Sequence, residues 1–399
     1  MISQNSGFHA LVLGATGISG WSLTSQLLHN YPRPGVWSRI TGVTRKAMSD
    51  EEMSYWPKDE RFTLASGFDL HNDNKEVLKR KFEAKVKDVE SVTHVYYLVH
   101  DPPVDFDSSD PFAVTLGGLS RTLSVIENLA PGLKFIHLQC GTFIYGVCFT
   151  DDFYHPVPLS EDLPPIREPL CNMLHYQVWT DFMRDFSKGK SWGWCETRPD
   201  EIIGFVPRMN SYNAAHPIAV YLSLFAYING ERAECPFPGS FGTWKALSNQ
   251  AGAEMIAKAA IHLSLLDDPS VNGQGYNVAS SATPSNWEAT WPAICSWFGL
   301  VGKPPVDCDK DKTRLSGPDE YIRVHENEYK RMLDEYGLKH WPAVSPTMDG
   351  SPNWGLTKLS FDRQLNLQKL KATGFAEDER LEESWIRALE LMRKAKVIP

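Results

Sequence analysis

Short apolar runs alternate with longer segments of helical periodicity through the first third of the chain. Residues 9–13, His-Ala-Leu-Val-Leu, form a run typical of a buried strand, and the leucines within 21–28 recur at helical spacing. Further strand-like runs occupy 39–45, 94–99 and 134–139, with helical segments expected at 74–87 and 113–129. This alternation predicts an α/β fold in which a doubly wound parallel sheet carries helices on both faces.

The pattern changes after residue 150, where closely spaced prolines exclude a regular helix or a central strand. We therefore place a sheet domain at 1–160 and a smaller, mostly helical substrate lobe at 161–399. A β-rich segment at about 190–205 is expected to return to the sheet, so the two parts interleave. Helices of the second part are expected at 172–188, 214–229, 251–265, 286–299 and 380–395.

The composition is that of a folded protein, and the partner that it leaves is a small molecule. Of the 399 residues, 42% are hydrophobic and 22% are charged, which excludes a disordered chain. The 40 basic and 49 acidic side chains give a net charge of −9 without a basic cluster, which argues against nucleic acid or an anionic membrane as a partner. No membrane-spanning stretch or secretory leader is visible, so we expect a cytoplasmic protein. A homodimer is compatible with these features.

The seven cysteines are odd in number and scattered, without the spacing of a zinc site, and we interpret them as reduced thiols. Asp101, Asp105, Asp107 and Asp110 lie close together in a segment that also contains two adjacent prolines. A solvated acidic loop accounts for these aspartates better than a metal site does, because no other ligands converge there. No metal is expected.

A glycine-rich turn, Gly14-Ala-Thr16-Gly17-Ile18-Ser-Gly20, connects the first strand to the first helix. Glycines permit a tight turn and let backbone N–H groups approach the pyrophosphate of a dinucleotide, while the helix amino terminus adds partial positive charge. A purely structural turn is the alternative. Because a strand and a helix flank the motif in the correct order, we predict that this turn, including Thr16 and Ile18, binds a dinucleotide.

Two cations, Arg45 and Lys46, end the second predicted strand, where a site that prefers NAD more often places an acid. They suit the 2′-phosphate of NADP(H), and the alternative is a solvated basic turn. Asp69, in Gly67-Phe-Asp69-Leu, is a candidate for contacting the adenine, although an acidic loop residue is usually only a surface feature.

Landmarks along the whole chain resemble one known family. They are the glycine turn, Gly42-Val-Thr-Arg45, Thr93-His-Val-Tyr-Tyr97, Leu138-Gln-Cys-Gly-Thr142, Arg198-Pro199, Phe237-Pro-Gly239, Trp244, Asn277, Trp287 and the ending Lys396-Val-Ile-Pro399. In this order and spacing the chain resembles the progesterone 5β-reductase and iridoid synthase-like (PRISE) enzymes of the extended short-chain dehydrogenase/reductase group. The resemblance implies a Rossmann fold, use of NADPH, and hydride transfer to the carbon–carbon double bond of an enone or enal.

Two catalytic positions follow from the resemblance. The family's tyrosine, which donates a hydrogen bond to the substrate oxygen, corresponds to Tyr176, although Trp179 and Thr180 replace the acidic pair that follows it. The family's lysine, which steadies the cofactor ribose and favours negative charge in the site, corresponds to Phe143. A phenyl ring can neither lower the pKa of the tyrosine nor stabilise an enolate by charge. We therefore expect a protonated phenol and hydride transfer that is either slowed or abandoned.

Three further side chains are candidates for the pocket. Tyr145, two residues beyond Phe143, is an alternative hydrogen-bond donor. His175 is a candidate proton shuttle with a pKa near neutral, against the more common reading of a lone histidine as surface or core. His100 follows the strand-like run at 94–99, at the edge of the sheet where cofactor and substrate meet in doubly wound folds.

The segment after Arg198 resembles the one whose backbone lies beside the nicotinamide in this group. Pro199 and Ile202 are therefore candidates for the cofactor wall. Asp200 and Glu201 depart from the apolar pair that is usual there.

These features leave three functions. We expect an NADPH-dependent reductase of an activated alkene or carbonyl in a hydrophobic terpenoid- or polyketide-like compound. Phe143 in place of lysine motivates the alternative, a non-redox cyclase or isomerase on the same fold, in which positioning of the substrate supplies most of the catalysis. A cofactor-sensing binding protein without catalysis is the third.

Overall fold

The structure is a computed structural model that describes residues 7–100, 112–150, 156–208, 210, 212–306, 317–339 and 353–399. The acidic run at 101–110 and Cys308 lie outside these ranges. The other six cysteines are free thiols. No helix in the described part of the chain is both long and apolar enough to cross a membrane.

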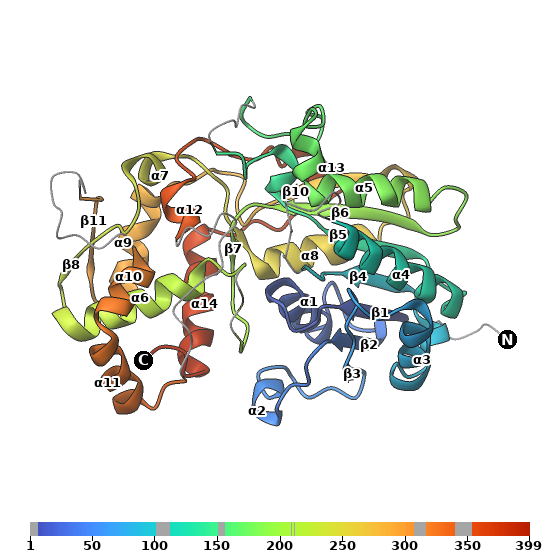
Figure 1. The fold of residues 1–399 in the computed structure, drawn as a ribbon, viewed down its shortest axis with the longest axis horizontal. Helices are drawn as coiled ribbons and strands as arrows, with labels where there is room; N and C mark the ends of the chain where they lie inside the picture. Colours follow the sequence, from blue (N-terminus) through green and yellow to red (C-terminus); the bar gives the residue numbers. More distant parts are fainter. Residues whose placement is uncertain are drawn as a thin grey trace.

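Seven parallel strands form one sheet in the order β10-β6-β5-β4-β1-β2-β3 (Figure 1). Their bounds are β1 Phe8–Leu13, β2 Trp37–Thr44, β3 Phe62–Ser66, β4 His94–Tyr97, β5 Phe135–Gln139, β6 Gly193–Pro199 and β10 Gln274–Val278. The strand order reverses between β1 and β4, and sheets of this kind bind ligands at the carboxyl ends of the strands beside such a reversal. The predicted α/β class with a doubly wound parallel sheet is confirmed.

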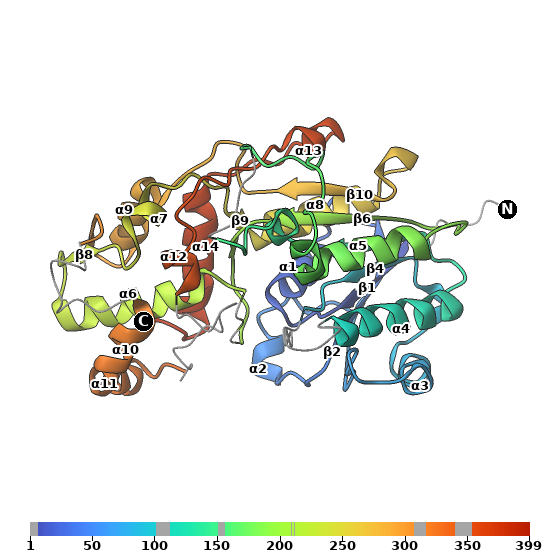
Figure 2. The same ribbon diagram turned by 45° about the horizontal axis from the view of Figure 1, so that its top comes forward.

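Helices cover both faces of the sheet, because alternate side chains of a central strand such as β1 are buried on opposite faces. Its Ala10 and Val12 belong to one core, shared with α1 and α8, whereas Leu11 and Leu13 belong to the other core, shared with α3, α4 and α5. The bounds of these helices are α1 Ile18–Leu28, α3 Lys75–Lys85, α4 Ala113–Leu129, α5 His175–Phe186 and α8 Ala253–Ser264. Figure 2 shows α3, α4 and α5 following one another along one face. A strand buried on both faces has a continuous apolar sequence, as 9–13 does.

The part of the chain after residue 160 supplies two strands to the sheet. β6 lies within the β-rich segment near 190–205 and pairs with β5, and β10 pairs with β6 in turn. The sequence pattern does not predict β10 because it reads Gln-Gly-Tyr-Asn-Val, in which the polar Asn277 is fully buried. The pattern also misses β3. The domain boundary at residue 160 stays a prediction.

A second lobe lies beside the sheet and is mostly helical, on the left of Figure 1. It contains α6 Ala215–Asn229, α7 Phe241–Lys245, α9 Trp287–Trp297, α10 Pro318–Val324, α11 Glu326–Tyr336, α12 Trp354–Thr357 and α14 Leu381–Lys394, with the paired strands β8 Glu234–Pro236 and β11 Val301–Lys303. Phe237 is at its centre, and the rings of Trp244, Trp287 and Trp291 lie 5.2–5.4 Å from it. These tryptophans therefore pack the core.

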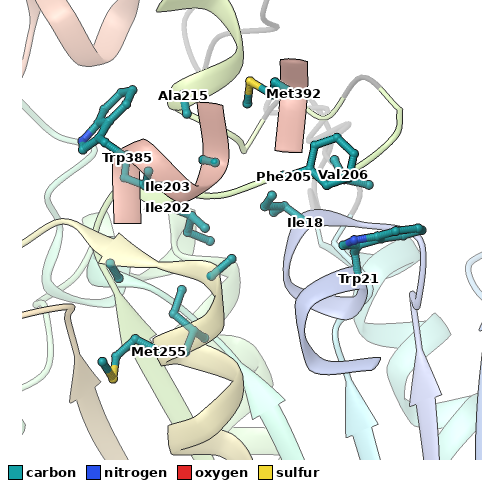
Figure 3. Close-up of a cluster of buried hydrophobic side chains, with 14 of the residues drawn as sticks. Ile18, Trp21, Ile202, Ile203, Phe205, Val206, Ala215, Met255, Trp385 and Met392 are labelled. Atoms are coloured by element: carbon teal, nitrogen blue, oxygen red, sulfur yellow. The ribbon is translucent and has the colours of Figure 1, made fainter. Parts of the chain in front are cut away.

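Four short elements complete the fold. α2 Asp50–Met53 lies between β2 and β3, and α13 Gln368–Ala372 follows the lobe's α12 in the chain. β7 Ile202–Ile203 pairs with β9 Ala251–Gly252. Figure 3 shows apolar side chains of α1, the 202–206 segment, α8 and α14 meeting in one cluster. The sheet and the lobe thus share a continuous core.

Candidate active site

The turn after β1 is so tight that only glycine fits at its two ends. Gly14 has a φ of +82°, and a Cβ on it would lie 2.7 Å from the carbonyl oxygen of Leu98. A Cβ on Gly20 would lie 2.1 Å from the carbonyl oxygen of Gly14. Glycine at these positions therefore lets α1 begin directly against β1, at the reversal of the strand order.

The amino terminus of α1 has no side-chain cap. Its N-cap residue is Gly17, whose backbone is extended and which has no side chain to accept from the first N–H groups of the helix. Thr16 Oγ1 lies 2.8 Å from Thr44 Oγ1, which fixes the turn to the end of β2. The side chain of Ile18 is buried and points toward the 202–206 segment (Figure 3). The first N–H groups of a helix and its dipole favour a phosphate, so the turn fits the pyrophosphate of a dinucleotide.

Arg45 and Lys46 follow β2 directly and are exposed at the same edge of the sheet. Asp69 is close to them, and its carboxylate accepts hydrogen bonds from the backbone and side chain of Asn72. Burial alone would raise the pKa of Asp69, but these bonds and the Arg45 charge lower it below its usual value. The carboxylate is thus ionised and partnered. The assignment of Arg45 and Lys46 to a 2′-phosphate stays a prediction.

Tyr176, the second residue of α5, brings its hydroxyl to the carboxyl ends of β5 and β6. A Cβ on Gly141 would lie 3.6 Å from Tyr176 Oη and 3.3 Å from the carbonyl oxygen of Pro199, the last residue of β6. Tyr176 is 9% exposed. Within the described residues its hydroxyl makes no hydrogen bond. The side chain is therefore largely buried, and the proton of its hydroxyl is not committed to a described partner.

The environment of Tyr176 keeps its phenol protonated. Burial raises the pKa of Tyr176 well above its usual value of 10, and the charges that Tyr212, Cys140, Cys148 and Glu196 can carry act in the same direction. None of these influences is cationic. The direction of this pKa shift agrees with the expected protonated phenol.

Phe143 and Tyr145 lie on a 3-10 turn, η2 (Thr142–Tyr145), that follows β5. The ring of Phe143 meets Trp354 of α12 edge-on, with the ring centroids 5.8 Å apart. Tyr145 Oη donates to Asn277 Oδ1 at 2.8 Å and accepts from Arg198 Nη1 at 3.0 Å. Because its single proton is engaged, Tyr145 serves a buried network in this arrangement and has no proton to offer to a substrate.

His100 and His175 join Tyr176 in an aromatic cluster. The ring of His175 lies 3.9 Å from that of Tyr176 and 4.6 Å from that of His100, centroid to centroid. Trp179 and Tyr212 pack against His100 from two sides. Burial, together with His100, holds the pKa of His175 well below its usual 6.5. The near-neutral pKa expected for His175 is therefore wrong, because the buried imidazolium would lose its hydration, and the ring is neutral at pH 7.

The segment after β6 divides between two environments. The carbonyl oxygen of Pro199 faces Gly141, whereas Ile202 lies in the apolar cluster of Figure 3. Between them, Asp200 and Glu201 both form ion pairs with Arg363, at 2.9 Å each. The two acids that depart from the apolar pair thus have a buried counter-ion, as buried carboxylates require.

Sequence reasoning missed Arg363. The sequence does show that a cation is needed, because two acids at a position expected to be apolar require a counter-ion when they are buried. The sequence does not say which of its 40 basic residues supplies that cation, and Arg363 lies more than 160 positions away. Asn277, whose Oδ1 accepts the hydrogen bond from Tyr145, is a landmark of the resemblance to which the sequence assigns no role.

Comparison with known proteins agrees with the resemblance found in the sequence. Residues 10–399 match the model of the PRISE-like Rossmann-fold domain. The short chain dehydrogenase ausT of Aspergillus calidoustus is 35% identical over 396 residues, which cover 98% of this chain and 94% of that protein. The (S)-8-oxocitronellyl enol synthase ISY2 of Nepeta racemosa is 29% identical over 296 residues, which cover 73% of this chain and 68% of that one.

Among solved structures, the UDP-glucose 4-epimerase of Thermus thermophilus in complex with NAD superposes with a TM-score of 0.58. The match covers 97% of this chain and 99% of the epimerase at 15% sequence identity. At this identity the likeness concerns the fold alone.

Proposed function

Because the chain belongs to the PRISE-like Rossmann-fold family of short-chain dehydrogenases, we propose that it is an NADPH-dependent reductase of a hydrophobic secondary metabolite. The reacting group is an activated alkene or a carbonyl. The observation that carries the proposal is the position of the Tyr176 hydroxyl beside Gly141, at the carboxyl edge of the sheet. The relatives named above, a fungal short chain dehydrogenase and a plant enol synthase, support an enzyme of this type.

The cofactor assignment rests on two groups of residues. Gly14, Gly17 and Gly20 shape a turn that fits a pyrophosphate, and Arg45 and Lys46 are two exposed cations at the end of β2 that suit a 2′-phosphate. A bound NADPH supplies a hydride to an electrophilic carbon. The cation pair favours NADPH over NADH.

Tyr176 is the residue that acts on the substrate in this proposal. Its hydroxyl donates one hydrogen bond to the carbonyl oxygen, which polarises the carbonyl and any conjugated alkene. No lysine assists it at the Phe143 position, and one missing oxyanion-stabilising group typically costs about 10² to 10³ in rate. The chemistry is therefore slow or reserved for a strongly activated substrate.

The surroundings support an apolar substrate. Phe143 pairs with Trp354, and the rings of His100, His175 and Trp179 pack around Tyr176. Aromatic surface of this kind binds ligands through apolar area, with few polar groups to fix orientation. A hydrophobic terpenoid- or polyketide-like compound fits this description.

The test is the oxidation of NADPH with a panel of enals, enones and ketones that carry apolar chains. The proposal expects turnover with at least one activated compound and a preference for NADPH over NADH. If the protein binds NADPH by calorimetry yet oxidises it with no member of a broad panel, the reductase proposal fails.

A second function, a non-redox cyclase or isomerase, is favoured by one specific observation. The largest influences on the pKa of Tyr176 all raise it, and Phe143 occupies the position where the resemblance implies a cation. Such a site supports hydrogen bonding to a neutral carbonyl better than it supports an enolate. Product formed without equivalent loss of NADPH would select this function, and strict dependence of product on reduced cofactor would reject it.

A further inference from the structure

A buried chain of hydrogen bonds connects the η2 turn to the last part of the sequence. Thr142 Oγ1 donates to Asp200 Oδ1 at 2.9 Å. Asp200 Oδ2 accepts from Arg363 Nε at 2.9 Å, and Arg363 Nη2 donates to Glu201 Oε2 at 2.9 Å. Gln250 completes the chain by donating to the same Glu201 oxygen at 3.1 Å.

Only an arginine can make the central contact. Its planar guanidinium has five donors in a fixed fork, so it can bind two carboxylates and a carbonyl at once, whereas a lysine ammonium is a single point charge on a flexible stem. The side chain of Arg363 is 2% exposed and that of Asp200 is 4% exposed. A third donor, Nη1, reaches the carbonyl oxygen of Leu359 at 3.4 Å.

A buried ion pair is weak evidence for stability, because the loss of hydration offsets most of the attraction. A buried ion pair is better explained by a role in holding the chain in one specific arrangement. Here the fixed partners are Thr142, directly after Gly141, and Asp200, directly after Pro199. A Cβ on Gly141 would meet both the Pro199 carbonyl oxygen, at 3.3 Å, and the Tyr176 hydroxyl, at 3.6 Å, so the two backbones and the hydroxyl are close neighbours.

We propose that Arg363 is a positioning residue for the reaction. Through Asp200 and Thr142 it holds the backbones of Gly141 and Pro199 in register beneath the Tyr176 hydroxyl. The inference rests on the proposed function, since it assigns the network to the placement of that function's hydrogen-bond donor and cofactor wall. It also explains why this chain has two acids at a position where the resemblance implies apolar side chains.

The experiment compares three variants with the full-length wild-type chain. Thr142→Val removes the hydroxyl but keeps the shape and leaves the ion pairs intact, and Thr142→Ser restores the hydroxyl. Arg363→Lys keeps the charge and removes the fork. The matched control is Arg387→Lys, because Arg387 of α14 also contacts two carboxylates, those of Glu254 and Glu379, at 3.1 Å and 2.6 Å.

Hydrogen exchange of the η2 amides reads out the positioning without any need for turnover. The amide of Ile144 bonds to the carbonyl of Gly141 at 3.1 Å, and that of Gly146 bonds to the carbonyl of Phe143 at 2.9 Å. Losing one charge-assisted hydrogen bond should speed exchange of both amides about tenfold or more in Thr142→Val and Arg363→Lys. The Thr142→Ser and Arg387→Lys variants should exchange at the wild-type rate.

Steady-state kinetics separate positioning from stability. With a substrate found on the panel, kcat should fall at least about tenfold in Thr142→Val while KM and the NADPH dissociation constant change less than about twofold. Wild-type exchange at η2 and an unchanged kcat in Thr142→Val would overturn the inference, even if Arg363→Lys fails to fold. A wild-type enzyme without turnover would instead end the proposed function, and the exchange data would still decide whether the network orders η2.

Discussion

The hydroxyl of Tyr176 lies over the α-carbon of Gly141, so closely that a methyl group on that carbon would sit 3.6 Å from the oxygen. A substrate oxygen that accepts a hydrogen bond from this hydroxyl must approach to within about 2.8 Å. A side chain at position 141 would occupy space beside the hydroxyl that glycine leaves free.

Gly141→Ala should therefore abolish most turnover without unfolding the protein. Gly141 has an extended backbone that alanine also adopts, with φ near 180°. The added methyl would still lie 3.3 Å from the Pro199 carbonyl, a tight contact that a small shift relieves. We expect kcat/KM to fall about a hundredfold with a nearly unchanged melting temperature. Gly132→Ala, on an open surface, is the control, and equal activity in both variants would contradict the placement of the substrate.

Tyr176→Phe and Tyr145→Phe should have opposite effects. Tyr176→Phe removes a proton with no described partner, so stability should hold while kcat falls about 10² to 10³. Tyr145→Phe leaves Arg198 and Asn277 each short of a buried partner, so the free energy of unfolding should fall by about 1–3 kcal/mol. Urea unfolding and turnover measured on both variants check this. Loss of activity in Tyr145→Phe alone would identify Tyr145 as the donor.

The apolar parts of the fold were predictable because burial dictates their sequence. β1 lies between two cores and therefore reads as an uninterrupted apolar run, and the strand and helix around Gly14 were expected in the right order. β10 was not predicted, because its buried Asn277 donates hydrogen bonds to partners far away in the sequence, the carbonyl oxygens of Leu159 and Asn366. Such partners leave no local periodicity in the sequence.

The positions of the candidate site residues were predictable from the sequence, but their protonation states and their partners were less so. Tyr176 and Phe143 were located through a resemblance that fixes positions along the chain. The neutral His175 was not predictable, because its pKa depends on burial and on the ring of His100, which comes 75 positions earlier. Arg363 was not predictable either, because the sequence does not show which distant residue pairs with Asp200 and Glu201.

Turnover should be insensitive to phenol ionisation through the alkaline range. The protonated form of Tyr176 is the active one, and burial raises its pKa above 10. The raised pKa keeps the phenol protonated, and so able to donate, to higher pH. The contribution of this protonated phenol to the free energy of unfolding is fully present below about pH 10 and is lost as the pH rises through the raised pKa. A pH profile of kcat measured with saturating NADPH checks this. A decline with a midpoint near pH 8 that disappears in Tyr176→Phe would show a lowered pKa and contradict the structure.

Replacing the cations after β2 should change the choice of cofactor. In Arg45→Ala and Lys46→Ala, the dissociation constant for NADPH should rise about tenfold each, because each loses one contact to a dianionic 2′-phosphate, while that for NADH should stay the same. Arg33→Ala is the control, since Arg33 is exposed and precedes β2, at the opposite edge of the sheet. Calorimetric titrations with both cofactors measure the effect. Equal weakening of NADPH and NADH would argue for a general defect and against a 2′-phosphate site.

Phe143→Lys should supply the cation that the resemblance implies at this position. A cation at this position favours the ionised phenol and negative charge on the substrate oxygen, so the pKa of Tyr176 should fall and reduction of simple enones should quicken by up to about 10². The substitution removes the edge-on contact with Trp354, so we expect a stability loss of about 0.5–1.5 kcal/mol. Phe143→Met, which removes the ring without adding charge, separates the two effects. If Phe143→Lys gains no reductase activity while it still binds NADPH, the missing cation is not what limits this site, and the cyclase alternative gains support.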